Sequence, residues 1–225
     1  MKMRKKKLRI HQMDQQPIMK LLEKIVQILL RRNPSNLADL CIVGLGNPGD
    51  KHSKTRHNLG YDFVELIAQR FNTQFSASKK LDASIAEFNF GEKSILLVKP
   101  NAFINLSGKT LSLIKRYKVN SLDKVLVVHD DMDLQPSEVK LKVGGSDGGH
   151  NGLKDIIKTV GKEFIRLRFG IGHPAIKADT NAWVIKKPSP EEKKLIADSF
   201  DKAIFALDDI LHLEWLLAMN KLHSK

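Results

Sequence analysis

Val125-Leu126-Val127-Val128-His129-Asp130-Asp131 is the stretch that decides the fold, because four consecutive apolar residues run directly into three polar ones. A strand that is apolar at every position is typical of the centre of a sheet that helices cover on both faces. In open sheets of this kind, ligands bind beyond the carboxyl ends of the strands. The stretch therefore predicts an α/β fold and puts Asp130 at the edge where a functional site is expected.

Strand and helix patterns alternate on both sides of this stretch. Apolar or alternating runs predict strands at 40–45, 84–90, 94–98, 139–143 and 164–171. Apolar residues at helical spacing predict helices at 59–71, 104–117 and 152–160, one from the Ser189-Pro190-Glu191-Glu192 capping box to about Leu207, and a last one to Lys221. Gly91-Glu92-Lys93 lies between two of the strands and predicts an antiparallel hairpin. We expect residues 39–225 to form a single-domain three-layer sandwich with a mixed, mostly parallel central sheet flanked by helices.

The composition supports a globular domain and excludes several other classes of protein. The chain has 225 residues, of which 42% are hydrophobic, so it can bury a core and is not a disordered chain. Its single cysteine, Cys41, excludes an internal disulfide and a multi-cysteine zinc site, and it indicates a reducing compartment. Because Cys41 lies within an expected strand, we interpret it as a small core residue.

Residues 1–38 form a basic extension that we expect to be an amphipathic helix or disordered. They hold ten basic residues and two acidic ones, so they carry +8 of the net charge of +13. One helical face collects five apolar side chains: Ile18, Leu21, Leu22, Ile25 and Leu29. The charge favours an anionic partner such as nucleic acid. No apolar run resembles a secretory signal or a membrane span, so we expect a cytoplasmic protein with no membrane partner.

Polar residues gather after the expected strands. Asn47 and Asn105 each follow a strand, and a glycine-rich loop at 144–149 leads into His150 and Asn151. Each feature has an ordinary structural alternative, because asparagine often forms turns or helix caps and glycine loops often only make turns. Taken singly, none of them indicates a function.

Nucleotide and metal sites receive little support from the sequence. Gly44-Leu45-Gly46-Asn47-Pro48-Gly49 is similar to a dinucleotide-binding loop, but Pro48 lacks the N–H that would face a phosphate. The loop at 144–149 lacks the Lys of a P-loop. Two histidines and an aspartate could bind a metal, yet the HxH and HExxH spacings are absent. We therefore expect neither a metal nor a cofactor.

Taken together, five sequence blocks resemble bacterial-type peptidyl-tRNA hydrolase in order and spacing. The blocks are Gly44-Leu45-Gly46-Asn47-Pro48-Gly49, Thr55-Arg56-His57-Asn58 with Gly60, Lys99-Pro100 with Asn105-Leu106-Ser107-Gly108, His129-Asp130-Asp131-Met132-Asp133-Leu134, and Gly144-Gly145 with Gly148-Gly149-His150-Asn151-Gly152-Leu153-Lys154. Arg166-Leu167-Arg168 before Gly170-Ile171-Gly172 extends the match. The resemblance runs from about residue 40 to the last helix.

The resemblance implies a monomeric, cofactor-free hydrolase that cleaves the ester between a stalled peptide, or an N-blocked amino acid, and its tRNA. It thereby implies tRNA recycling in translation and ribosome rescue. By motif, His57 is the general base, Asp130 is the carboxylate that orients it, and Asn47 is the third catalytic residue. Lys142 and Arg168 fall where the family clamps tRNA phosphates. The residues implied to contact the substrate are Asn105, Asn151, His150, His52 and Phe103.

Three positions depart from the family pattern. His52 replaces the aromatic residue expected three residues after the Asn47-Pro48-Gly49 turn, and Ala102 and Ile104 replace the usual Thr and Met before Asn105. These positions line or support the pocket, so they concern the fit of the substrate more than the chemistry. His52 can also titrate near the site.

The residue types suit ester hydrolysis by water. A neutral imidazole with a pKa near ~6.5 can take a proton from water at physiological pH. No Ser or Cys nucleophile is evident beside His57, which favours direct attack by water over an acyl-enzyme. Asn47 and Asn105 can donate to the developing oxyanion, and Asn151 can position the peptide or the water.

Two other functions remain open at this stage. One is a non-enzymatic RNA-binding protein on the same fold, which the basic extension would suit. A pure binder, however, has no physical need for a base paired with a carboxylate. The other is a phosphate- or nucleotide-binding enzyme, which rests on the glycine loops alone.

Overall fold

The computed structural model describes residues 37–174, 176 and 179–224. The extension expected at 1–38 and its apolar face therefore lie outside the described residues, except for Leu37 and Ala38. Ala38 is buried, and its N–H donates to the carbonyl of Lys118 over 2.7 Å. Within the described ranges, no helix is long and apolar enough to cross a membrane.

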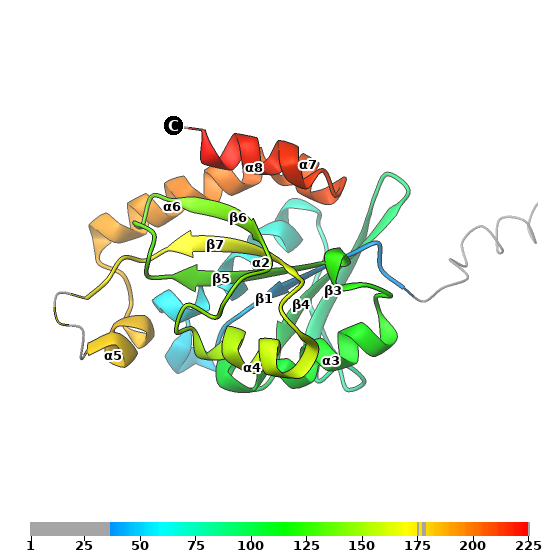
Figure 1. The fold of residues 1–225 in the computed structure, drawn as a ribbon, viewed down its shortest axis with the longest axis horizontal. Helices are drawn as coiled ribbons and strands as arrows, with labels where there is room; N and C mark the ends of the chain where they lie inside the picture. The colour runs from blue at the N-terminus through cyan, green and yellow to red at the C-terminus, as the bar shows by residue number, and fades with distance from the viewer. Residues whose placement is uncertain (1–36, 175, 177–178, 225) are drawn as a thin grey trace, which may run out of the picture. The chain divides into compact units, whose positions relative to one another are not determined.

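In the described part of the chain, seven strands form one mixed sheet in the order β2-β3-β4-β1-β5-β7-β6 (Figure 1). The strands are β1 (Leu40–Gly44), β2 (Ser76–Ser78), β3 (Ala83–Phe90), β4 (Lys93–Pro100), β5 (Val125–Asp131), β6 (Val139–Val143) and β7 (Ile165–Gly170). The four central strands β4, β1, β5 and β7 run parallel, whereas β3 and β6 lie antiparallel to their neighbours. The predicted hairpin and the predicted mixed, mostly parallel sheet are confirmed.

Helices cover both faces of this sheet, which confirms the three-layer sandwich. One face carries α2 (Leu59–Arg70), α6 (Pro190–Phe205), α7 (Leu207–Leu211) and α8 (Trp215–His223), and the other carries α3 (Ser107–Tyr117) and α4 (Asn151–Val160) (Figure 1). Successive residues of a strand point to opposite faces, so Val128 of β5 packs in the first core and Val127 in the second. The apolar run of β5 follows from this double burial. Cys41 is fully buried in the second core, as the sequence indicated.

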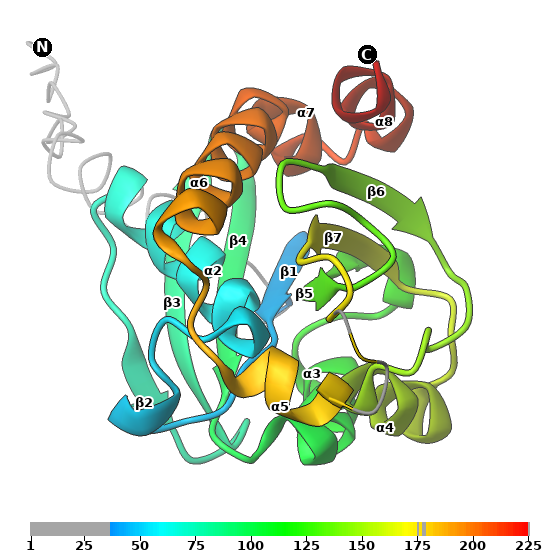
Figure 2. The same ribbon diagram turned by 90° about the vertical axis from the view of Figure 1, so that its left-hand side faces the viewer.

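Two short elements were missed by the sequence analysis, and one helix ends earlier than expected. The missed elements are β2 and α5 (Thr180–Ile185), which leads into α6 at the end of the sheet (Figure 2). The helix expected to reach about Leu207 ends at Phe205, and the single helix expected to follow it to Lys221 is divided into α7 and α8. The predicted capping box is confirmed, because Ser189 Oγ accepts from the Glu192 N–H and the Glu192 carboxylate accepts from the Ser189 N–H.

Two glycines allow α2 to begin directly on the end of β1. A Cβ added to Gly44 would lie 2.2 Å from the carbonyl oxygen of Gly60, and one added to Gly60 would lie 2.4 Å from the carbonyl oxygen of Val128. Backbone therefore packs on backbone at this point, and any side chain would separate the two elements. This close approach brings the residues just before α2 to the carboxyl edge of the sheet, beside the end of β5.

Candidate active site

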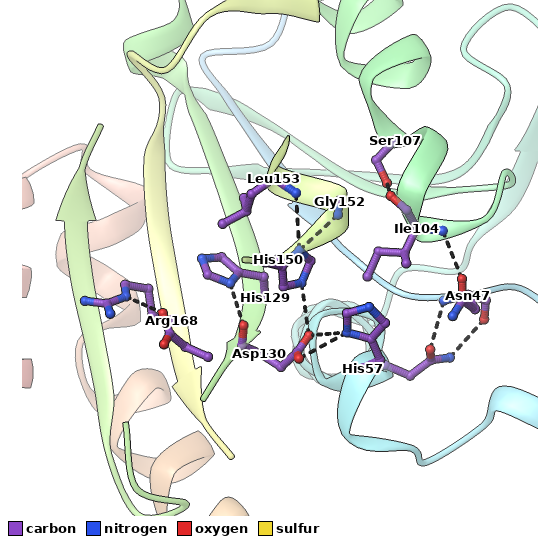
Figure 3. A network of polar contacts seen from close by, with 12 residues as sticks. Asn47, His57, Ile104, Ser107, His129, Asp130, His150, Gly152, Leu153 and Arg168 are labelled. Atoms are coloured by element: carbon purple, nitrogen blue, oxygen red, sulfur yellow. Dashed lines mark hydrogen bonds and ion pairs between the residues drawn. The ribbon is translucent and has the colours of Figure 1, made fainter. Parts of the chain in front are cut away.

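His57 and Asp130 form a buried pair at that edge (Figure 3). His57 lies in the 3-10 turn Arg56–Asn58 before α2, and its Nδ1 lies 2.9 Å from Asp130 Oδ1 and 3.1 Å from Oδ2. The two residues are 7% and 3% exposed. β1 ends at Gly44, opposite Val128, whereas β5 continues to Asp131. The Asp130 carboxylate therefore stands beyond the end of β1, where the turn can reach it.

His150 is the second imidazole on the same carboxylate. Its Nδ1 accepts from the backbone N–H groups of Gly152 and Leu153, at 3.1 and 3.2 Å, so this histidine caps α4 (Figure 3). A backbone N–H can only donate, so Nδ1 carries no proton and the proton of the neutral ring is on Nε2. Nε2 lies 3.2 Å from Asp130 Oδ1 and donates to it. The start of α4 thus fixes the tautomer of His150.

The hydrogen bonds of Asp130 also fix which ring nitrogen of His57 carries the proton. Asp130 is an acceptor toward both rings, so His57 donates from Nδ1 and keeps its lone pair on Nε2. Among the described residues, none hydrogen-bonds His57 Nε2. The ring of His57 lies 4.9 Å from that of His150, between centroids. The arrangement therefore presents one basic nitrogen at the edge of the sheet.

The charges of the cluster follow from burial and from the shared carboxylate. Burial lowers the pKa of His57, but the charge and hydrogen bond of Asp130 outweigh it, so the net pKa lies above its ordinary value. Burial alone would raise the pKa of Asp130, yet His57 and His150 hold it far below its usual range, so the carboxylate is ionised. The pKa of His57 is thus higher than the ~6.5 of a free imidazole that the sequence analysis assumed.

A third imidazole, His129, is neutral and contributes no charge. It is 2% exposed, and its Nδ1 donates to the backbone carbonyl of Asp130 over 2.7 Å. Burial and the neighbouring His150 lower the pKa of His129 to about 3. In the described chain, the two imidazoles whose ring N–H groups bond the Asp130 carboxylate are therefore those of His57 and His150.

Asn47 is held beside this cluster by the backbone. Its Oδ1 accepts from the N–H of Ile104 over 2.9 Å, which fixes the side-chain amide with Nδ2 as the donor end, and Nδ2 bonds no residue in the described ranges. The side chain of Asn58 bonds both backbone groups of Asn47, at 2.8 and 3.0 Å. Asn58 therefore stabilises the Asn47 turn, and no side-chain cap bond to α2 is formed by it. Figure 3 shows Asn47 and His57 on neighbouring segments at the same edge.

The expected substrate-contact residues lie on the segments that follow β1 and β4 and at the start of α4. Asn151 is exposed at the first turn of α4 and lines a pocket with His57 and His150. Asn105 is exposed, one residue after the Ile104 N–H that holds Asn47. The loops of His52 and Phe103 meet each other, with ring centroids 6.1 Å apart and Phe103 51% exposed.

Lys142 and Arg168 lie on one face of the neighbouring strands β6 and β7. In the strand register, Lys142 is opposite Arg166 and Lys140 is opposite Arg168, so the four basic side chains share a face. Lys142 is exposed and forms no ion pair within the described residues. The Nε of Arg168 bonds Asp131 over 2.7 Å.

His57, Asp130 and His150 could also be considered as metal ligands, because their ligand atoms lie within 4.8 Å of one another. His57 Nδ1 and His150 Nε2 lie 2.9 and 3.2 Å from Asp130 Oδ1, and both are hydrogen-bond distances. His150 Nδ1 is already occupied by the amides of α4. The two ring nitrogens that face Asp130 and the Nδ1 of His150 are thus already hydrogen-bonded, whereas His57 Nε2 bonds no described residue.

Several residues of the site were missed by the sequence analysis. Thr180, Asn181 and Val184 of α5 line the same pocket as His57. Arg56, next to the histidine, is buried and bonds the segment that follows α5. The block Thr55-Arg56-His57-Asn58 contained Arg56, but nothing in the sequence indicated which distant segment it contacts.

An ionised carboxylate that orients one basic imidazole at the carboxyl edge of an α/β sandwich is an arrangement that suits an enzyme of the hydrolase class. A family model described as peptidyl-tRNA hydrolase matches residues 41–225. A peptidyl-tRNA hydrolase of Leptothrix cholodnii is 40% identical over 184 residues, covering 81% of this chain and 86% of its own. One of Teredinibacter turnerae is 40% identical over 195 residues, covering 86% and 99%.

Solved structures agree with these sequence matches. The crystal structure of peptidyl-tRNA hydrolase from Acinetobacter baumannii superposes with a TM-score of 0.79 at 33% identity, covering 84% of this chain and 96% of that chain. The chain therefore belongs to the peptidyl-tRNA hydrolase family and is an ester hydrolase.

Proposed function

We propose that this enzyme hydrolyses the ester bond between a peptide, or an N-blocked amino acid, and tRNA, with water as the nucleophile. The observation that carries the proposal is the His57–Asp130–His150 cluster, in which every proton is assigned and one lone pair, on His57 Nε2, remains for a substrate water. Membership of the family supplies the substrate class. The reaction would return tRNA to translation in the cytoplasm. We propose that the enzyme acts as a monomer and needs no cofactor.

In the proposed step, His57 Nε2 takes a proton from water while the water oxygen forms a bond to the ester carbonyl carbon. The carbonyl π electrons move to its oxygen, and the ionised Asp130 stabilises the imidazolium that results. Collapse of the intermediate breaks the bond to the ribose oxygen, which leaves with the proton of the imidazolium. His150 stays neutral throughout and holds the carboxylate in place through Nε2.

Peptide release from a purified N-acyl-aminoacyl-tRNA tests the proposal directly. We expect release of the acyl amino acid from this substrate and much slower cleavage of the unblocked aminoacyl-tRNA. Binding of both RNAs without release from either would instead support the RNA-binding alternative.

Asn47 is proposed to donate to the oxyanion through Nδ2. In Asn47→Asp, an oxygen remains to accept from the Ile104 N–H, but the donor is lost and a negative charge takes its place. We expect kcat to fall by about 10²- to 10³-fold, because loss of an oxyanion donor of this kind costs ~3–4 kcal/mol. Single-turnover hydrolysis measures the effect.

The matched control for Asn47 is Asn101→Asp, which makes the same chemical change at an exposed position after β4. A loss of kcat in both variants, or in neither, would contradict the role of Asn47.

Five further residues are proposed to hold the peptide, because their segments border the same edge of the sheet: Asn105, Asn151, His150, His52 and Phe103.

Lys142 and Arg168 are proposed to contact tRNA phosphates, since Lys142 is an exposed cation with no ion pair in the described chain. We expect Lys142→Ala to raise KM and to reduce the slope of log KM against log salt by about one. Lys115→Ala, an exposed lysine on α3, should leave both unchanged. If the slope of log KM against log salt were the same in Lys142→Ala as in the wild type, the proposed contact of Lys142 with a tRNA phosphate would be contradicted.

A further inference from the structure

Arg56, the residue before the proposed base, is a buried cation that the mechanism above does not use. It is 4% exposed. Its Nη1 donates to the carbonyls of Trp183, Lys186 and Lys187 at 3.2–3.3 Å, and its Nη2 donates to both oxygens of Glu192, at 2.9 and 2.7 Å. All of these acceptors lie more than 120 residues further along the chain, at the end of α5 and the start of α6.

Two further contacts hold α5 to the same turn. The guanidinium carbon of Arg56 lies 3.6 Å from the centroid of the Trp183 ring, close enough for a cation–π contact. The Arg56 backbone N–H donates to the carbonyl of Lys186 over 3.1 Å. The indole N–H of Trp183 donates to the carbonyl of Gly172 over 2.9 Å. The short helix α5 is therefore held between the His57 turn and the end of β7.

The carboxylate that receives Arg56 is itself fixed. Glu192 accepts from the Ser189 N–H over 2.7 Å as part of the capping box of α6. Burial favours the neutral acid, but the hydrogen bonds from Arg56 and Ser189 hold the pKa of Glu192 below its usual range, so it is ionised. The pair is short, bidentate and largely buried on the arginine side, where loss of one partner leaves an uncompensated charge.

α5 forms one wall of the pocket that contains His57. Thr180, Asn181 and Val184 line this pocket, and residues 147–151 line it too. The contacts of Arg56 do not include Asp130 or His150. Movement of α5 would therefore alter the shape of the pocket and leave the charge and orientation of the base unchanged.

We propose that Arg56 is a positioning residue that holds α5 against the turn of the general base and so forms the wall of the substrate pocket. This inference rests on the proposed function for the identity of the substrate. A wall that contacts the substrate equally in the ground state and the transition state affects KM and leaves kcat nearly unchanged.

Arg56→Lys tests this role, because lysine keeps the charge but has neither the planar fork nor the stacking face. We expect KM for N-acyl-aminoacyl-tRNA to rise about tenfold while kcat stays within about threefold. The acid limb of the kcat–pH profile should keep its wild-type position, since Asp130 still pairs with His57. In the enzyme alone, hydrogen exchange of the amides at 180–187 should become faster.

Glu192→Gln and Glu191→Gln provide a matched pair on one helical turn. Glu192 contacts Arg56, whereas Glu191 is exposed and bonds the Ser189 hydroxyl over 2.8 Å. We expect Glu192→Gln to reproduce the rise in KM and the faster exchange, and Glu191→Gln to match the wild type. If Arg56→Lys does not fold, this pair of variants still tests whether the Arg56–Glu192 contact holds α5 in place.

Two results would overturn the inference. One is unchanged exchange at 180–187 in both Arg56→Lys and Glu192→Gln. The other is a loss confined to kcat with a shifted acid limb, which would mean that Arg56 acts through the base. Because exchange is measured without substrate, a wild-type enzyme that released no peptide would refute the proposed function and leave this test of Arg56 standing.

Discussion

Replacing His57 by alanine should lower kcat for peptide release by about 10⁴-fold, the upper end of what a general base contributes. His57 Nε2 is the one ring nitrogen of the three-residue cluster that carries a lone pair without a hydrogen-bond partner in the described chain. No neighbouring group replaces it, because Nδ1 of His150 is occupied by the start of α4. The affinity for tRNA should stay close to the wild-type value, since the phosphate contacts proposed for Lys142 lie on other strands.

Single-turnover hydrolysis and equilibrium tRNA binding measure the two effects separately. His57→Gln is a useful second variant, because its amide N–H can still donate to Asp130 but an amide is not a base. His212→Ala is the control, since it removes an exposed imidazole at the end of α7. Residual activity of His57→Gln near the wild-type level would show that another group takes the proton from water.

Replacing Asp130 by asparagine should lower kcat by about 10³- to 10⁴-fold with the fold retained. The Asp130 carboxylate accepts from both His57 and His150, whereas an asparagine side chain has one acceptor oxygen and one amino group. The amino group would face one of the imidazoles and favour the wrong tautomer. Loss of the charge also removes the stabilisation of the imidazolium.

The pH dependence of kcat gives a second and independent test of how Asp130 acts on His57. In the wild type, Asp130 raises the pKa of His57 above its ordinary value, so kcat should rise with pH through a value above that of free imidazole. In Asp130→Asn, burial remains and the raising charge is gone, so the acid limb should move to lower pH. Asp131→Asn, which removes the carboxylate that bonds Arg168, should leave the limb in place. An acid limb that did not move in Asp130→Asn would contradict the assignment of the limb to His57.

The local pattern of the sequence was sufficient for most of the fold. The four apolar residues of β5 require burial on both faces, so helices on both sides could be expected without knowing which ones. The turn Gly91-Glu92-Lys93 and the capping box at Ser189 are short-range signals, and both are confirmed. α5 was missed because six residues with no fully buried side chain show no clear apolar period.

The motifs named the candidate site residues, and the resemblance implied that Asp130 orients His57, but the chain does not show which backbone contacts bring the two together. The approach of His57 to Asp130 joins residues 73 positions apart, and it depends on the contact between Gly44 and Gly60. The role of His150 as the cap of α4 could not be read from the chain, where Asn151 was the more ordinary cap.

The sequence by itself determined the α/β class, the two-sided burial of β5 and the set of polar residues at the strand ends, because these depend on neighbours along the chain. Only the tertiary structure decided which nitrogen of each imidazole holds a proton, which end of the Asn47 amide is free, and which wall Arg56 supports. The physical reason is that each of these is set by one hydrogen bond to a group distant in sequence or to a backbone amide whose direction exists only after folding.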